Sequence, residues 1–509
     1  MGWTGGYSDR VVTHLQQRAA VATKGLSGQN LNLGFGCVVL FLLPFATVGT
    51  VTLVMALQRA AAGNWTEALF LGLFAVTFGG VGFGGIAAAL VGRRKVKEQA
   101  ALEARHPDSP WLWRPDWASG RIIDSSRVTM YTAWAFAAFW NLLSFPTGFL
   151  GVRAALQEGK PAALLALLFP LVGIGLLVWA SRATLRYRKY GVSRLELATI
   201  PGLVGRTLTG MVRAPARVQP EEGFRVILSC VRRVRTRRGK NSSTSESILW
   251  QDERLVAGEP SRTAAAMETH IPVAFRLPVD AEPCTDINSD NRVLWRLQLS
   301  ASVAGVDYEA RFEVPVFRTP ASDQPLSAEE ERITRDQVAV TVYAQPADSR
   351  IAVTSNRRGT EVLFPAARNP GVATSVTLLL LIWLGCIALQ MYFRAPLIFP
   401  IITGLVGLLI LIGVLDLWLT VSRVTVDAGT LTWATGYLFP GRERTLHASE
   451  IADLIASIGM QAGTTVYYDV VVVRKNGKKL KVGTSLRNKR EAEWLAGVLK
   501  KALGERVSS

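Results

Sequence analysis

Histidine and cysteine are scarce in this chain of 509 residues. It contains four of each, and no two cysteines form a CxxC pair. Neither a zinc site nor a disulfide framework is therefore predicted. The motifs of serine hydrolases, zinc peptidases, P-loop NTPases and dinucleotide-binding enzymes are also missing. We therefore expect a protein that is not an enzyme, with no catalytic residues, cofactor or metal.

Acidic residues are outnumbered by basic ones. Lys and Arg total 57 against 39 Asp and Glu, which gives a net charge of +18. Such a charge would suit nucleic-acid binding in a soluble protein. Here, however, the basic residues flank long apolar runs, as they do in the cytoplasmic loops of membrane proteins. We therefore expect membrane lipid, and no nucleic acid, among the partners.

Six apolar runs are each long enough to cross a hydrocarbon core. Short connections group them into three pairs, which predicts three transmembrane hairpins. The first run is too long for the apolar part of a signal peptide and is expected to be an uncleaved span. The expected spans cover residues 35–57, 68–91, 130–150, 162–180, 372–393 and 397–421.

Basic clusters determine the expected orientation. Such clusters follow the second span at 93–97 and the fourth at 182–189, whereas the connections within the pairs carry few charges. The positive-inside rule places both clusters in the cytoplasm. Both termini and all soluble parts are then expected on the cytoplasmic side of a bacterial inner membrane.

The chain is expected to alternate between membrane hairpins and cytoplasmic parts. In order, these are an N-terminal segment (1–34), transmembrane hairpin 1 (35–92), a Trp/Arg-rich loop (93–129), transmembrane hairpin 2 (130–182), a β-sandwich region (191–369, core 213–318), transmembrane hairpin 3 (372–421) and a C-terminal domain (422–509).

The Trp/Arg-rich loop contains Trp111, Trp113 and Trp117 in the segment PWLWRPDWASGRI. Interleaved Trp and Arg beside a membrane are typical of interfacial anchors. A nucleic-acid stacking platform uses the same residue types but has no other support here. The three tryptophans are therefore predicted to be interfacial anchors.

Polar residues within the spans are few. Asn141 and Asp416 are the candidate intramembrane polar residues, and such residues can mark a transport pathway. Asp416 is expected at the interface near Arg423. Gly80 and Gly84 form a small-xxx-small pair that lets helices approach closely. We expect it to pack within this protein, with homodimerisation as the alternative.

The region between the fourth and fifth spans alternates apolar and polar residues. Residues 292–303 and 308–316 predict an antiparallel hairpin with one buried face, and the polar segment 235–247 predicts a mobile loop. Several short strands separated by proline and polar turns predict a β-sandwich. The further strands are expected at 224–231, 247–251 and 270–277.

The segment IPVAFRLPVDAEP, followed by VLWRLQLSASVAGVDYEARFEVPVF, resembles the arrestin-like β-sandwich pattern. In that pattern a strand ending in proline precedes a long hairpin that closes in an apolar strand. An immunoglobulin-like sandwich remains an equal alternative on these residues.

The C-terminal domain has two turn motifs and one amphipathic segment. Asp427-Ala428-Gly429 and Asn476-Gly477 predict hairpin turns. Residues 489–503 predict a helix with Asn488 as N-cap and Glu491 at the third helical position. Strands followed by one terminal amphipathic helix resemble a pleckstrin-homology-like domain.

That resemblance implies a membrane-facing surface. The residues concerned are on the late hairpin, where they are candidate contacts for anionic lipid head groups. The alternative is a solvated basic edge that protects an edge strand. They are Lys475, Lys478, Lys479 and Lys481.

The whole chain resembles multispanning bacterial membrane proteins without an assigned activity, in which helix hairpins bracket a cytoplasmic β domain. The segments that carry this resemblance are PWLWRPDWASGRI, KYGVSRLELATIPGLVGRTLTG and FPAARNPG. We therefore expect a non-enzymatic integral membrane scaffold or adaptor, whose cytoplasmic β domains bind a protein partner or the membrane surface. A transporter or channel subunit is the alternative, which the scarcity of polar residues in the spans disfavours.

Overall fold

A computed structural model gives the structure of the chain. It describes residues 28–504 except 158, 160–165, 222, 239–240, 261–267, 286–289, 329, 333–344, 346–348, 357–358, 393, 395, 428 and 463–464. Most of the expected N-terminal segment, residues 1–27, therefore lies outside the described residues. The chain divides into two compact units, residues 1–228 with 254–324 and residues 229–253 with 325–509.

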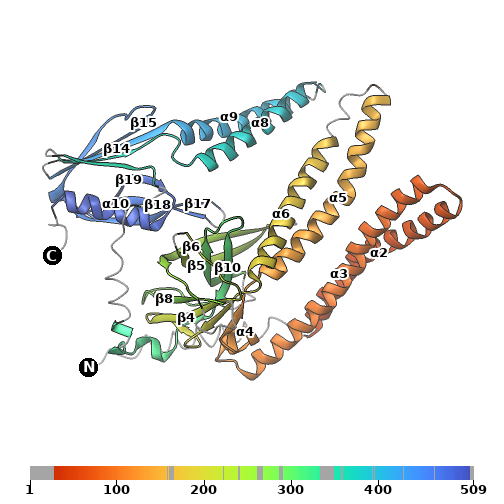
Figure 1. Ribbon diagram of the computed structural model, residues 1–509, viewed down its shortest axis with the longest axis horizontal. Helices are drawn as coiled ribbons and strands as arrows, with labels where there is room; N and C mark the ends of the chain where they lie inside the picture. The colour runs from red at the N-terminus through yellow and green to blue at the C-terminus, as the bar shows by residue number, and fades with distance from the viewer. Residues whose placement is uncertain are drawn as a thin grey trace, which may run out of the picture. The chain divides into compact units, whose positions relative to one another are not determined.

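Long apolar helices occur as antiparallel pairs in both units (Figure 1). Six helices in the described part of the chain are long and apolar enough to cross a membrane. This is consistent with a multi-pass membrane protein. The first unit contains α2 (Gly28–Ala61), α3 (Trp65–Arg105), α5 (Ser126–Gln157) and α6 (Leu168–Tyr190), and the second contains α8 (Pro370–Tyr392) and α9 (Ile398–Leu419).

The helix ends differ from the expected spans at several points. Helix α3 continues through the basic cluster to Arg105, because nothing after residue 91 breaks a helix until His106-Pro107. Helix α9 ends at Leu419 instead of residue 421, and the β-branched Thr420 and Val421 begin a strand. The expected start of the fourth span at residue 162 lies outside the described residues.

Helices α2 and α3 pack through glycines other than the predicted pair. A Cβ atom on Gly82 would lie 2.3 Å from the backbone nitrogen of Ala46, and one on Gly49 would lie 2.4 Å from that of Gly79. A Cβ on Gly80 or Gly84 would meet nothing within 4 Å. The small-xxx-small pair therefore does not form this helix contact, which corrects the prediction. The glycine spacing identified α3 as a closely packed helix but assigned the contact to the wrong face of that helix.

The sheets formed by strands β1 to β11 are mainly antiparallel, and most of β5 and β6 belongs to the second unit. A five-stranded sheet has the order β1-β2-β4-β8-β7, a four-stranded sheet the order β10-β9-β5-β6, and β11 pairs in parallel with β3. The strands are β1 (Arg121–Ile123), β2 (Arg194–Leu197), β3 (Gly202–Leu203), β4 (Thr207–Ala214), β5 (Phe224–Arg238), β6 (Asn241–Val256), β7 (Glu259–Pro260), β8 (Thr269–Arg276), β9 (Asn291–Ala301), β10 (Tyr308–Val314) and β11 (Val316–Phe317).

The predicted hairpin with one buried face is confirmed as β9–β10. Its register pairs Trp295 with Val314 and Leu297 with Phe312, and all four side chains are buried. The segment 235–247, predicted as a mobile loop, instead belongs to strands β5 and β6, apart from residues 239–240, which lie outside the described residues. Arg233 and Glu246 form an ion pair of 2.6 Å across these strands, which explains how polar residues sustain the pairing.

The sheets of the second unit are also antiparallel. A five-stranded sheet has the order β12-β13-β14-β15-β16, and a three-stranded sheet has the order β17-β18-β19. One core joins both sheets to the terminal helix α10 (Lys489–Ala502). The strands are β12 (Ala352–Asn356), β13 (Gly359–Phe364), β14 (Thr420–Asp427), β15 (Thr430–Tyr437), β16 (Arg444–His447), β17 (Ile451–Ala462), β18 (Thr465–Arg474) and β19 (Lys479–Leu486).

The C-terminal β domain begins earlier than expected. We use this name for strands β12 to β19 with α10, residues 351–504. The sequence assigned residues 352–364 to the sandwich region and began the C-terminal domain at 422, but β13 pairs with β14 from Thr360↔Val426 to Phe364↔Ser422. The hairpin α8–α9 is therefore inserted between two adjacent strands of one sheet. This corrects the expected boundary.

Both predicted turns of this domain are confirmed. Gly429 and Gly477 adopt positive φ angles of 80° and 79° at the ends of β14–β15 and β18–β19. Helix α10 is confirmed, and Asn488 occupies the N-cap position. Its side chain, however, makes no capping hydrogen bond, so the predicted cap is absent.

Candidate functional site

The end of the α8–α9 hairpin and the β13–β14 pair meet directly. Helix α9 ends at Leu419 and β14 begins at the next residue. Both elements are labelled in Figure 1. The backbone carbonyl of Leu419 accepts a 2.8 Å hydrogen bond from the amide of Leu438, just beyond β15. Since α8 and α9 are antiparallel, the start of α8 lies at this same end. We refer to this region as the hairpin end of the C-terminal β domain.

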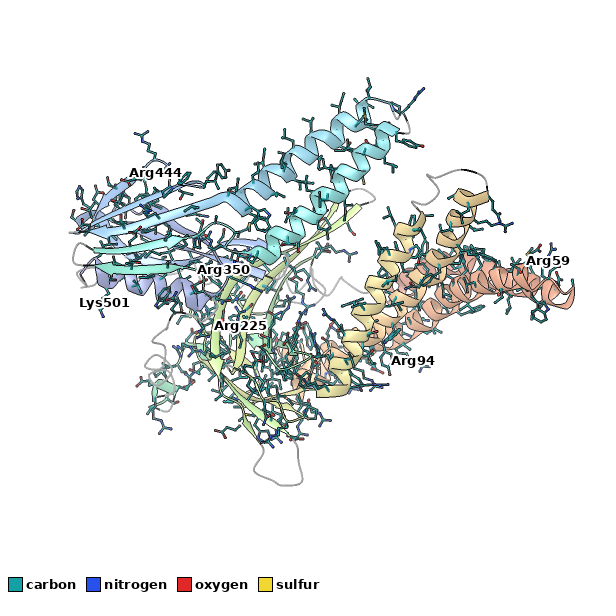
Figure 2. All side chains as sticks on the ribbon, turned by 45° about the horizontal axis from the view of Figure 1, so that its top comes forward. Arg59, Arg94, Arg225, Arg350, Arg444 and Lys501 are labelled. Atoms are coloured by element: carbon teal, nitrogen blue, oxygen red, sulfur yellow. The ribbon has the colours of Figure 1, made fainter. Side chains whose placement is uncertain are left out.

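A cavity of about 570 Å³ opens at the hairpin end, around the start of α8. It is lined by three arginines from separate segments and by one carboxylate. Arg350, labelled in Figure 2, precedes β12, Arg368 precedes α8, and Arg487 precedes α10. The carboxylate is Glu491, and the lining includes Asn369 and Asn488. The balance of formal charges is therefore positive.

Arg368 is held firmly within this cavity. Its guanidinium lies over the ring of Phe364, with Cζ 5.2 Å from the ring centroid. Burial lowers the pKa of Arg368, although the carboxylates of Glu491, Asp469 and Asp416 oppose that change. An arginine still remains charged at physiological pH. Its Nη1 is buried and finds no hydrogen-bond partner among the described residues.

The amide and carboxylate groups of the cavity differ in their pairing. Asn369 donates from Nδ2 to the carbonyl of Ser485 at 3.4 Å. Glu491 accepts a 2.6 Å hydrogen bond from the hydroxyl of Ser349. The Oδ1 atom of Asn488 is buried and has no partner within the described part of the chain. The cavity thus has unused hydrogen-bonding capacity at Arg368 and Asn488, which buried polar groups rarely leave unfilled.

An exposed apolar loop lies beside the end of α9. Tyr437, Leu438 and Phe439 expose 58%, 58% and 77% of their surfaces, respectively. Leu438 has a φ angle of 63°, which is rare for a bulky residue, and its amide bonds to Leu419. Three large, exposed, apolar side chains therefore lie next to the last turn of the apolar helix α9.

Three of the four predicted lysines lie away from the cavity. Lys475 and Lys478 are beside the turn of β18–β19, and Lys481 forms a 2.7 Å ion pair with the buried Asp469. Ser485, which lines the cavity, is seven residues beyond Lys478 along the hairpin, roughly 20 Å at the rise of a strand. Lys479 is likewise near the turn. Lys475, Lys478 and Lys479 therefore do not reach the cavity. Lys481 is linked to its wall, because Asp469 also accepts a 3.0 Å hydrogen bond from the amide of Ser485.

Sequence reasoning missed the three arginines that do line the cavity. Each precedes a structural element, so each sits in a short connection with little pattern of its own. The available indication was Arg368-Asn369-Pro370, a basic and helix-starting triplet directly before an apolar run. A similar indication was Arg487-Asn488 before the terminal helix.

The tryptophans of the first unit do not behave as predicted. Trp117 is only 2% exposed, and its Nε1 donates to the carbonyl of Glu313 at 3.1 Å. Arg114 stacks on Trp117 with Cζ 4.3 Å from the centroid and pairs with Glu313 at 3.1 Å. Phe317 lies against both Trp117 and Trp111. Trp117 is therefore part of the interior of the first unit, which corrects its assignment as an interfacial anchor.

Trp111 and Trp113 are half-buried. Trp113 donates from Nε1 to the carbonyl of His106 at 2.7 Å, and this bond ties the loop back to the end of α3. Trp111 packs on Phe317 with ring centroids 5.6 Å apart. Both contacts are within the first unit. Alternating Trp and Arg can thus mark a docking segment as well as a membrane anchor.

The two intramembrane polar candidates are engaged with neighbouring groups. Asn141 of α5 is buried and donates from Nδ2 to the carbonyls of Ala137 and Gly173, at 2.7 and 3.1 Å. It therefore links α5 to α6. Asp416 accepts a 2.8 Å hydrogen bond from the hydroxyl of Thr420 at the end of α9. Its charge also acts on Arg368, whereas Arg423, beside which Asp416 was expected, pairs with Glu361 at 3.0 Å.

The described residues contain no cluster of side chains suited to bind a metal ion. No group of three or more His, Cys, Asp or Glu side chains within those ranges is placed to hold a metal ion. The described cysteines are free thiols, and Cys230 and Cys284 are buried. Burial raises the pKa of Cys284 to about 11, so its thiol stays protonated at neutral pH.

Comparisons with known proteins are uninformative about function. No protein-family model and no curated protein matches the chain. The crystal structure of the sporulation control protein Spo0M from Bacillus subtilis covers 62% of this chain and 97% of its own, at 11% identity and a TM-score of 0.18. The alkylpurine DNA glycosylase AlkC of Pseudomonas fluorescens, bound to DNA containing an abasic site analog, covers 57% and 82%, at 12% identity and a TM-score of 0.10. Neither similarity carries an argument.

Proposed function

We propose that the chain is a non-enzymatic integral membrane scaffold or adaptor, whose cytoplasmic β domains bind the membrane surface and a protein partner. The observation that carries this proposal is the exposed loop Tyr437-Leu438-Phe439, fixed beside the end of α9. If α8 and α9 cross a bilayer, this loop is at the depth where an apolar side chain leaves water. The C-terminal β domain then rests on the membrane through its own sheet.

The energetics favour such contact. Full burial of a large apolar side chain contributes about 1.5–3 kcal/mol. Since Tyr437, Leu438 and Phe439 are each more than half exposed, together they would contribute on the order of 3–5 kcal/mol on entering a bilayer interface. Arg442 and Arg444 follow this loop and would add about 1 kcal/mol each beside anionic lipid.

The first unit supports the scaffold role because its helices are joined to its sheet. The hydroxyl of Tyr190, the last residue of α6, donates to the carbonyl of Val306 at 2.5 Å. Asp124 accepts hydrogen bonds from the amides of Ser126, at the start of α5, and Arg311, in β10, at 3.1 and 2.9 Å. The hairpin α5–α6 is thus held to the β9–β10 hairpin by partly buried hydrogen bonds.

The finer parts of this proposal concern fold name and location. Two antiparallel sheets closed by one C-terminal amphipathic helix support a pleckstrin-homology-like domain, of residues 351–504. The basic clusters at 93–97, within α3, and at 182–189, within α6, support a bacterial inner membrane with both termini in the cytoplasm. An arrestin-like or immunoglobulin-like sandwich remains the proposal for the first unit. A transporter gains no specific support, because Asn141 serves to join two helices.

The membrane contact can be tested by measuring depth at Phe439. The variant Phe439→Cys, with the exposed Cys37 and Cys386 replaced by serine and labelled with bimane in proteoliposomes, should be quenched by lipids that carry a nitroxide in the upper acyl chain. The control Asn476→Cys, at the exposed turn of β18–β19, should instead be quenched by aqueous iodide. Equal iodide quenching at both positions would contradict the proposal.

The adaptor half requires a protein partner. Chemical cross-linking in native membranes, followed by affinity purification and mass spectrometry, should yield one stoichiometric partner with cross-links to the β domains. We expect those cross-links within 213–318 or 351–504. A cross-linked preparation that contains only this chain would reject the adaptor role and leave the membrane contact intact.

A further inference from the structure

We propose that the arginine-lined cavity at the start of α8 binds the head-group phosphate of an anionic glycerophospholipid. This inference rests on the proposed function, because it needs the C-terminal β domain to lie on the bilayer. The residues that carry it are Arg350, Arg368 and Arg487, which line one cavity of about 570 Å³. None of them belongs to the lysine hairpin or to the apolar loop.

Three guanidinium groups in one cavity suit a phosphate. Planar arginine side chains present paired donors that match phosphate oxygens, and such charge-assisted bonds are stronger than neutral ones. Arg350 donates weakly to the carbonyl of Ala367, at 3.4 Å. The guanidinium of Arg368 lies over the ring of Phe364, and this contact restricts the side chain before a ligand arrives. Preorganised donors lose little conformational freedom on binding.

The unpartnered polar atoms point to a missing ligand. Nη1 of Arg368 is buried and has no hydrogen-bond partner in the described ranges, and the same holds for Oδ1 of Asn488. Buried polar groups are nearly always paired. Neither atom is exposed to the cavity as it stands, so a phosphate oxygen would reach Nη1 of Arg368, and a head-group hydroxyl Oδ1 of Asn488, after a small movement of the cavity wall. The first amides of α8 at Gly371 and Val372 add donors at the positive end of a helix dipole.

The location favours a lipid over a soluble phosphate. The cavity includes Pro370, Val372 and Ser375, which form the first turns of an apolar helix. Val372 is 39% exposed, so an acyl chain can lie along α8 while its phosphate enters the cavity. The volume is also much larger than one phosphate ion requires, and it leaves room for a glycerol head group.

Glu491 refines the chemistry of the ligand. Its carboxylate lines the cavity and would repel a bare, doubly charged phosphate. The same carboxylate can accept a hydrogen bond from a hydroxyl beside the phosphate. Phosphatidylglycerol provides both a single negative charge and head-group hydroxyls. Phosphatidylcholine provides neither a net charge nor a donor.

The test uses the full chain in detergent and native mass spectrometry of bound lipid. Phosphatidylglycerol should be retained in preference to phosphatidylcholine. Arg487→Gln, at the exposed rim of the cavity, should weaken phosphatidylglycerol retention about tenfold or more. Lys478→Gln removes the same charge at the exposed turn of β18–β19 and should leave retention unchanged. Arg368→Lys keeps the charge but loses the fork, and should also weaken retention.

Three outcomes would overturn the inference. These are equal retention of the two lipids, equal losses for Arg487→Gln and Lys478→Gln, or competition by millimolar glycerol phosphate as strong as by phosphatidylglycerol. The last would identify a soluble ligand. If bimane at Phe439→Cys remains in the bilayer while lipid preference is absent, only this inference fails. If the bimane lies in water, the proposed function fails first.

Discussion

The substitution Gly82→Ala tests directly how α2 and α3 pack. A Cβ atom at this position would lie 2.3 Å from the nitrogen, 2.5 Å from the Cα and 2.8 Å from the Cβ of Ala46. Favourable contacts between carbon atoms lie at about 3.5–4.0 Å, so the helices must separate by roughly 1 Å. Two of the three nearest atoms belong to the backbone, and no side-chain rotation relieves the clash.

The expected loss follows from overpacking. Forcing an extra carbon into a close contact typically costs about 1–3 kcal/mol. Replacing glycine by alanine also favours a helix, by about 0.8–1.0 kcal/mol in water. Gly84→Ala shares this gain, but its Cβ would meet nothing within 4 Å. The difference between the two variants therefore isolates the clash, at about 1–3 kcal/mol.

Thermal unfolding in detergent gives the measurement. For a unit of this size, about 1 kcal/mol corresponds to roughly 2–4 °C in apparent Tm. Gly82→Ala should therefore unfold several degrees below Gly84→Ala, measured side by side at one heating rate. A larger drop for Gly84→Ala would refute the helix contact described above. It would restore Gly80 and Gly84 as the packing face, within the protein or between two copies.

Three further predictions concern buried side chains. Trp117→Ala should destabilise the first unit by about 3–5 kcal/mol, and denaturant unfolding that shifts by less than 1 kcal/mol would contradict its burial. Cys284, whose pKa is raised to about 11 by burial, should carry thiolate in only about one molecule per thousand at pH 8. Native maleimide labelling followed by mass spectrometry should leave it unmodified until denaturant is added. Burial lowers the pKa of Lys489, but the carboxylates of Asp252 and Glu493 outweigh it, so its pKa is raised overall. Its stabilising contribution should therefore hold from neutral pH to about pH 10 and vanish above, so the Tm difference between wild type and Lys489→Met should close only in that alkaline range.

Local patterns predicted the elements that depend on neighbouring residues. The β9–β10 hairpin followed from strict alternation across Val293, Trp295, Leu297 and Leu299. The turn at Gly477 followed from Asn-Gly, and α10 from its apolar stripe. Each of these signals lies within about fifteen residues of sequence, and each concerns one buried face. Such patterns predict structure well because the alternation of apolar residues reflects which face of the element is buried.

Pairings across long sequence separations were not predictable in this way. Strand β13 pairs with β14 across the whole inserted hairpin, from Phe364 to Ser422. Alternation shows that both are strands but not that they are neighbours. Trp117 was misassigned for a related reason, since its partner Glu313 is 196 residues away. A tryptophan beside arginine has the same local appearance at a lipid surface and inside a protein.

The arginine-lined cavity was unpredictable for two reasons, the long sequence separation of its residues and their lack of a local pattern. Arg350, Arg368 and Arg487 come from three connections separated by up to 137 residues, and none lies in a periodic segment. Only the closing of two sheets around α10 brings them together. The lysines of the β18–β19 hairpin were predicted as lipid contacts because their charges are adjacent in sequence. Charges adjacent in sequence are often fully solvated. Charges that folding brings together are partly desolvated, which costs free energy, and such groups are more often found at functional sites.

The insertion of α8–α9 between paired strands decides what kind of ligand the cavity can meet. A domain joined to a membrane by a flexible linker samples many heights above the bilayer. Here Phe364 and Ser422 are paired across β13 and β14. Helix α8 begins six residues after the end of β13, and α9 ends one residue before the start of β14. The sheet therefore holds the start of α8 at a fixed depth if the hairpin crosses the bilayer. Lengthening the connection 365–369 with flexible residues should allow the start of α8 to move relative to the sheet. This insertion should abolish lipid retention even with all three arginines present. Retention that survives this insertion would show that the arginines act as a free surface charge, independent of the sheet.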